Sequence, residues 1–114
     1  MSSALEDTFA FQLTAAGLTG YVREYVAIPG RKFRFDFAFI AERLLVEIQG
    51  GVWSGGAHGR PTGITRDMDK LNQAQINHWR VLQFDVKAVK SGEALQTTEK
   101  LINQSKEQLT CTKS

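Results

Sequence analysis

Several features that would mark a special class of protein are scarce or missing in this chain of 114 residues. Cys111 is the only cysteine, so no disulfide can form within the chain, and a single thiol fits a reducing compartment. The chain has no run of about 18 apolar residues, the length that a membrane-spanning helix needs, so no membrane span is predicted. Because the first segment carries Glu6 and Asp7 rather than basic residues, we expect no secretion signal and a cytoplasmic protein.

The charge balance is also unremarkable, with a formal net charge of +2. That small basic excess permits contact with nucleic acid without requiring it. Hydrophobic residues make up 42% of the chain and charged residues 23%, which are ordinary values for a globular protein. We therefore expect residues 1–114 to form a single domain with one sizeable core.

Hydrophobic periodicity predicts the element order α-β-β-β-α-β-α. Ser3 and Glu6 match a capping box at the start of the first helix, and Ser91 is the expected cap of the last one. The predicted helices cover residues 3–16, 65–79 and 91–109, and the predicted strands cover residues 21–28, 33–40, 43–49 and 80–86. On the second helix, Met68, Leu71, Gln75 and Trp79 are expected to share one face.

The second and third predicted strands are joined by so few residues that they should form an antiparallel hairpin. If paired residues have numbers that sum to 83, then Phe35, Phe37 and Phe39 lie on one apolar face. On the other face Asp36 lies directly opposite Glu47, with Cβ atoms about 5 Å apart. A slip of one residue would bury the charges and expose the phenylalanines, so this register is well specified.

Two carboxylates placed in this way repel each other, and a bound cation or a raised pKa can offset the repulsion. Ligands that offer only oxygen suit Mg²⁺, which keeps several waters for a phosphate substrate. Asp36 and Glu47 are therefore candidate metal ligands, with Mg²⁺ as the expected cofactor and Mn²⁺ as a substitute. The alternative is that both carboxylates are solvated and separately paired, for instance with Arg34.

The carboxylate pair belongs to a longer series of segments, namely Asp36–Phe37, Glu47–Gly51, His58, Arg66–Asp67 and His78–Phe84. Together with the element order, these segments resemble the PD-(D/E)XK nuclease superfamily, and most closely its small branch related to very-short-patch-repair endonucleases. The likeness covers roughly residues 1–86. It implies an α/β (α+β) fold with a restriction-endonuclease-like core, in which helices flank a central mixed sheet.

Two positions depart from the pattern of this family. Gln49 occupies the position of the motif lysine, which in the superfamily positions or activates the attacking water, and His78 replaces a glycine. Glutamine can hydrogen-bond a water but adds no positive charge. The resemblance makes Lys70, on the following helix, the candidate for a relocated lysine, whereas a lysine on an exposed helix face is usually only solvated. The resemblance implies that Glu6 assists the metal and its water, as first-helix acids of the superfamily do. The capping box with Ser3 explains Glu6 as well, and the two roles are compatible.

Residues 50–64 contain six of the ten glycines, and a long loop of this kind is usually functional or disordered. Trp53 would stack on a nucleobase or cover the core. His58 and Arg60 would contact a phosphate or act as general bases, or they belong to a mobile loop with no such role. Arg66, at the start of the next helix, would reach a phosphate.

The expected function is that of a Mg²⁺-dependent endonuclease acting on DNA. A chain of this length leaves little room for a target-recognition domain, so we expect nicking, structure-selective or weakly sequence-specific cleavage. The alternative is a catalytically attenuated or inactive nucleic-acid-binding module with the same fold. A homodimer would allow two nicks in one duplex, but no dimer interface can be predicted from this sequence.

Overall fold

The computed structural model of the chain describes residues 3–49 and 61–112, with side chains described for residues 3–49 and 67–106. The predicted order α-β-β-β-α-β-α is confirmed, with one short additional helix. In chain order the elements are α1 (Ala4–Ala15), β1 (Val22–Val26), β2 (Arg34–Phe39), β3 (Leu44–Gln49), α2 (Pro61–Ile76), β4 (Arg80–Asp85), α3 (Val86–Ser91) and α4 (Glu93–Thr112).

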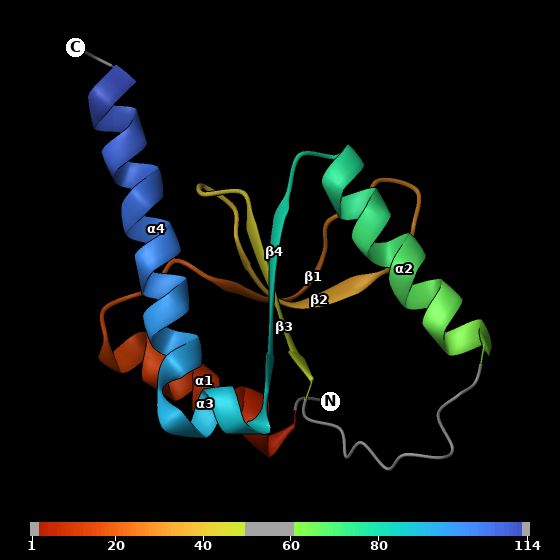
Figure 1. Ribbon diagram of the computed structural model, residues 1–114, viewed down its shortest axis with the longest axis horizontal. Coiled ribbons are helices and arrows are strands. Elements are labelled where there is room, and N and C mark those ends of the chain that lie inside the picture. Colours follow the sequence, from red (N-terminus) through yellow and green to blue (C-terminus); the bar gives the residue numbers. More distant parts are fainter. Residues whose placement is uncertain (1–2, 50–60, 113–114) are drawn as a thin grey trace.

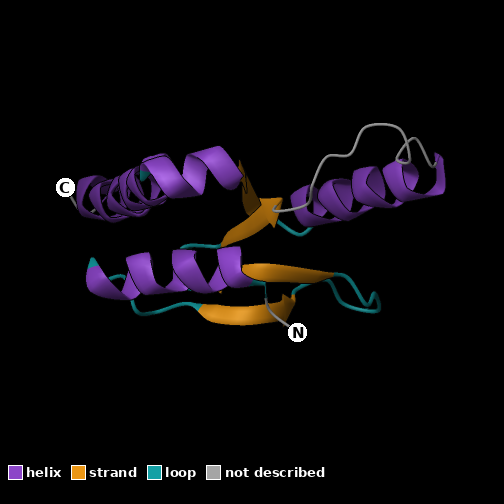
Figure 2. Cartoon of the chain, turned by 90° about the horizontal axis from the view of Figure 1, so that it is seen from below, coloured by secondary structure: helices purple, strands orange, loops and turns teal. Residues whose placement is uncertain are grey.

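The described strands form one mixed sheet in the order β1-β2-β3-β4. The pairs β1–β2 and β2–β3 are antiparallel, whereas β3 and β4 are parallel and are connected through α2. Helices α1, α3 and α4 lie on one side of this sheet and α2 lies on the other (Figure 1). The turned view shows α4 and α2 extending in opposite directions, with the strands between them (Figure 2). The α+β fold with a central mixed sheet is thus confirmed.

The core consists of two clusters, one on each face of the sheet. The first cluster joins α1, α3 and α4 to the strands and includes Phe9, Phe37, Val46 and Ile102. The second joins α2 to the strands and includes Phe35, Leu45, Ala74 and Trp79. Because β2 and β3 are covered on both faces, the ends of these strands are held firmly in place.

The hairpin register is the predicted one, because Phe37 pairs with Val46 and Phe39 pairs with Leu44. The expectation that Phe35 shares a face with these phenylalanines is wrong, since Phe35 packs in the cluster on the α2 side. The change of side occurs at Asp36, next to an irregularity in β1.

That irregularity is Glu24, which has a φ of 51° inside β1. A left-handed residue interrupts the regular alternation of a strand. Accordingly, the guanidinium of Arg23 lies over the Phe37 ring on one side of the sheet, while Tyr25 packs against Trp79 on the other. Phe35 is the register partner of Tyr25, and both side chains pack on the α2 side of the sheet.

Helix α2 differs from its prediction at its start and on its buried face. It begins at Pro61 rather than near residue 65, and proline suits the first turn of a helix because its φ is already helical. Met68 is 58% exposed, whereas Ala74 and Trp79 are buried, so the residues that pack against the sheet are only partly those of the face expected from the sequence. His78, with a φ of 65°, ends the helix, and the Trp79 N–H donates to the Ala74 carbonyl.

The region after β4 holds two helices where one was predicted. Asp85 caps α3, with its carboxylate accepting a hydrogen bond from the Ala88 N–H, and the left-handed Gly92 ends that helix. The Ser91 hydroxyl accepts from the Glu93 N–H at the start of α4. In the described part of the chain, no helix is long and apolar enough to cross a membrane.

Candidate active site

The sheet opens locally around Asp36. The pairing of β2 with β3 includes Phe37 but stops before Asp36 and Glu47, and the pairing of β1 with β2 skips Glu24 and Asp36. Side chains replace the missing main-chain bonds. The Asp36 N–H donates to Oε1 of Glu47 at 3.2 Å, and the Ile48 N–H donates to Oδ2 of Asp36 at 2.7 Å. The structure therefore brings together the two carboxylates that the register predicts to be opposite each other.

Lys70 reaches the same opening from α2. Its Nζ lies 2.6 Å from Oε2 of Glu47, and the two side chains are only 16% and 13% exposed. The ammonium also lies 4.6 Å from the centre of the Phe35 ring. Lys70 is thus a partner of the carboxylate pair rather than a solvated lysine, because a charge pair this far from solvent is weakly screened.

Glu6 approaches the site from α1 on the other side of the sheet. Its N–H donates to the Ser3 hydroxyl, so the predicted cap is present. Its carboxylate lies 3.9 Å from Arg23, which also pairs with Asp7 at 3.0 Å. Among the residues whose side chains are described, no three His, Cys, Asp or Glu side chains are close enough to share one metal ion. Ser3 is therefore the cap of α1, and the Glu6 carboxylate lies near Arg23. Within the described side chains, Glu6 does not join Asp36 and Glu47 as a third ligand.

Burial dominates the ionisation of both central carboxyl groups. It raises the pKa of Asp36, and the charge of Glu24 adds to this increase, whereas the Ile48 N–H and Lys70 oppose it. Burial also raises the pKa of Glu47, against the hydrogen bond and charge of Lys70. Burial and the nearby charge of Asp36 raise the pKa of Glu6. The site thus holds more negative charge than its surroundings favour.

This imbalance predicts a pH dependence of stability in the metal-free protein. The pKa of Asp36 is raised above its ordinary value of 3.8, so its contribution to stability is complete below that value and is lost as the pH rises through the folded-state pKa. The Asp36→Asn variant lacks this loss. Its melting temperature in EDTA should exceed that of the wild type by an amount that grows as the pH rises above about 4 and becomes constant once Asp36 is ionised in the folded wild type. A difference that does not vary with pH at all would contradict the assignment.

The remaining predicted site residues lie farther from this pair or outside the described residues. Gln49 is the exposed last residue of β3, in register with Asp85 of β4, and it borders an open hollow together with Lys87. Arg66 lies in α2, but its side chain is not among those described. Trp53, His58 and Arg60 lie outside the described residues, so their roles stay predictions.

Two residues at the site were not predicted from the sequence. Glu24 raises the pKa of Asp36 and of Glu6, and Arg23 has the opposite effect on both carboxyl groups. In the sequence they are adjacent polar residues of a predicted strand, and nothing there signals the positive φ of Glu24. Only the folded sheet shows that they border the opening.

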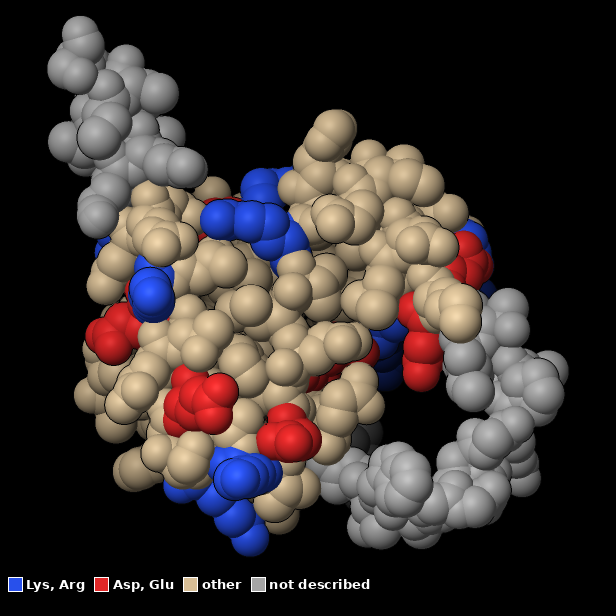
Figure 3. Space-filling model, viewed as in Figure 1, with Lys and Arg blue, Asp and Glu red and all other residues tan. Residues whose placement is uncertain are grey.

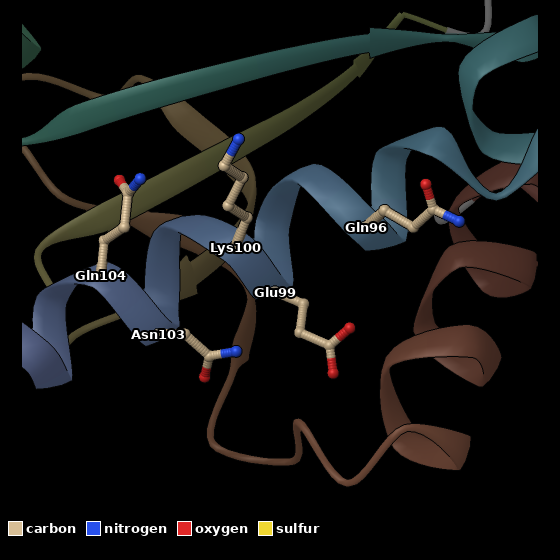
Figure 4. A pocket seen from close by; sticks show the side chains of 5 residues that line it. All are labelled: Gln96, Glu99, Lys100, Asn103 and Gln104. Carbon is tan, nitrogen blue, oxygen red and sulfur yellow. The ribbon is translucent and has the colours of Figure 1, made fainter.

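Another hollow lies along α4 and is lined by Gln96, Glu99, Lys100, Asn103 and Gln104. The close view shows Lys100 and Gln104 pointing to one side of the helix and Glu99 and Asn103 to the other (Figure 4). These polar groups do not converge, so the hollow is a poor candidate for catalysis. In the space-filling view, acidic and basic side chains are interspersed rather than gathered into one basic surface (Figure 3).

No protein-family model matches the chain, and no curated protein matches it. The four-stranded mixed sheet and its flanking helices nevertheless define a fold that occurs in nuclease catalytic domains. A similar solved structure is described as "Homing Endonuclease I-Bth0305I Catalytic Domain", with a TM-score of 0.69 and 17% sequence identity. The match covers 91% of this chain and 98% of the other. At this level of identity, the likeness shows the fold alone.

Proposed function

We propose that this chain is a metal-dependent endodeoxyribonuclease of the PD-(D/E)XK type, similar to the small branch that includes very-short-patch-repair endonucleases. The single observation that carries the proposal is the opening of the sheet at Asp36, where two partly buried carboxylates and the ammonium of Lys70 come together. The fold shared with a homing endonuclease catalytic domain supports the same conclusion. We propose DNA as the substrate.

The donor set at this opening fits Mg²⁺. Asp36 and Glu47 offer only carboxylate oxygens, and Mg²⁺ is commonly bound by one or two carboxylates while it keeps several waters. Burial disfavours the negative charge of both side chains, so a cation would relieve an existing cost. When bound, Mg²⁺ or Mn²⁺ would lower the pKa of a water nucleophile and offset charge that develops on the phosphodiester.

The residues of the chain would then have separate roles. Asp36 and Glu47 would hold the metal in a fixed orientation, because main-chain N–H groups already fix one oxygen of each carboxylate. Lys70 would supply the positive charge that the motif usually has at position 49, and Gln49 would hydrogen-bond the attacking water. Glu6 would influence the site through its charge.

Four residues would contact the DNA itself. We propose that Trp53 stacks on a base and that His58, Arg60 and Arg66 contact phosphates. Such contacts would make DNA binding weaken as the salt concentration rises.

The direct test incubates the protein with supercoiled plasmid, single-stranded DNA and branched DNA in the presence of Mg²⁺, Mn²⁺ or EDTA. We expect cleavage with either metal and none with EDTA. Because one chain carries one site, the nicked circle should accumulate before the linear form, whereas a homodimer acting on both strands would produce linear DNA early. Binding without cleavage in any metal would favour the inactive binding module, and failure to bind DNA would exclude both functions.

A further inference from the structure

Both carboxylate oxygens of Glu47 already have partners in the metal-free fold. Oε2 of Glu47 is bound by Lys70 Nζ at 2.6 Å, and Oε1 accepts a hydrogen bond from the Asp36 N–H. Both oxygens of this proposed metal ligand are therefore engaged. A metal that binds Glu47 must either share an oxygen with one of these partners or displace one of them.

Sharing Oε2 with Lys70 is unfavourable. A Mg²⁺ ion lies about 2 Å from a carboxylate oxygen, so on Oε2, which is 2.6 Å from Nζ, it would lie no more than about 4.6 Å from the ammonium. A divalent ion and an ammonium repel strongly at that separation, and the low exposure of Lys70 and Glu47 limits screening by solvent. The main-chain N–H on Oε1 belongs to the hairpin and cannot leave so easily.

Lys70 has the freedom to move. Its ammonium is carried on a flexible four-carbon stem, and its attachment point on α2 need not shift when the stem changes rotamer. It also lies over the face of the Phe35 ring and near the charge of Asp36, and neither contact is a direct ion pair like the one with Glu47. Lys70 is therefore the partner of Glu47 that a metal would displace.

We propose that Lys70 and the divalent cation exchange places at Glu47. The ammonium pairs with Oε2 in the metal-free protein and withdraws when the metal binds, which frees it for the substrate phosphate or the attacking water. The inference rests on the proposed function, and it adds that Lys70 weakens metal binding while it assists the reaction. Binding of the metal and release of the Lys70 ammonium from Glu47 then occur together.

The test measures Mg²⁺ binding to the full chain by calorimetry without DNA, in the wild type and in Lys70→Met. The variant should bind Mg²⁺ at least tenfold more tightly, and its metal-free melting temperature should fall because Glu47 loses its partner. Lys70→Arg keeps the charge and should bind Mg²⁺ as the wild type does. Lys100→Met, an exposed lysine on α4, controls for the general loss of one positive charge. Unchanged or weaker binding by Lys70→Met would overturn the exchange.

A second measurement uses the wild type alone, in case Lys70→Met does not fold. An amine-acylating reagent with mass-spectrometric detection should label Lys70 slowly without metal, relative to the exposed Lys87. Adding Mg²⁺ should increase labelling of Lys70 several-fold and leave Lys87 unchanged, and equal labelling in both conditions would refute the exchange. Cleavage of DNA without these effects would reject only the exchange, whereas a protein that neither binds Mg²⁺ nor cleaves DNA would reject the proposed function.

Discussion

Asp36→Asn and Glu47→Gln should each lower the rate of DNA cleavage by roughly 10³-fold or more. Each change removes one of two carboxylates that would hold the metal, and a bound metal contributes several kcal/mol to the stabilisation of a phosphoryl transition state. The rate is measured as initial nicking of supercoiled plasmid with Mg²⁺. Asp69→Asn is the matched control, because Asp69 is an acid of α2 that pairs with Arg31 and lies outside the opening.

The stability of the two variants separates loss of chemistry from loss of fold. Asparagine at position 36 can still accept from the Ile48 N–H and no longer repels Glu24 and Glu6, so the metal-free melting temperature should not fall. Glutamine at position 47 removes the carboxylate that is bonded directly to the largely buried ammonium of Lys70, so the melting temperature should fall. Rapid cleavage by the double variant, or full activity in EDTA, would show that the carboxylate pair is not the catalytic centre.

The part of this site that can be predicted from the sequence is the part fixed by strand periodicity. The alternation of phenylalanines in β2 and the short turn specify one hairpin register, and the structure has that register at Phe37–Val46. Given the register, the opposition of Asp36 and Glu47 follows without knowledge of the rest of the chain. Local patterns also predict the element order, because most helices and strands here agree with their own periodicity.

The remaining features depend on contacts between distant segments. The left-handed Glu24 moves Phe35 to the α2 side, and no local propensity favours a positive φ for glutamate. The pairing of Lys70 with Glu47 depends on the position of α2 against the sheet, and a single sequence does not specify that position. Helix α3 was missed because its cap, Asp85, is also the last residue of β4.

Lys70→Ala should lower the turnover rate by roughly 10²-fold or more without weakening the binding of Mg²⁺. An ammonium aimed at the reacting phosphate or its water is worth about this much in a site that excludes solvent. Its present partner, Glu47, would be a ligand of the metal, which places the ammonium beside the reacting groups. Turnover at saturating Mg²⁺ and DNA is the quantity to compare, because it separates the chemical step from binding.

A lysine at position 49 should compensate for this loss. Gln49 follows Glu47 by two residues on the same strand, so the two side chains project from the same side of β3, about 7 Å apart at their Cα atoms. A lysine stem spans most of that distance, and this position is where the PD-(D/E)XK pattern has its lysine. Gln49→Lys in the Lys70→Ala background should therefore recover turnover to within about tenfold of the wild type, while Gln49→Met should recover none. If neither Lys70→Ala nor Gln49→Lys changes the rate, then another group activates the water, and Glu6 and His58 become the residues to substitute next.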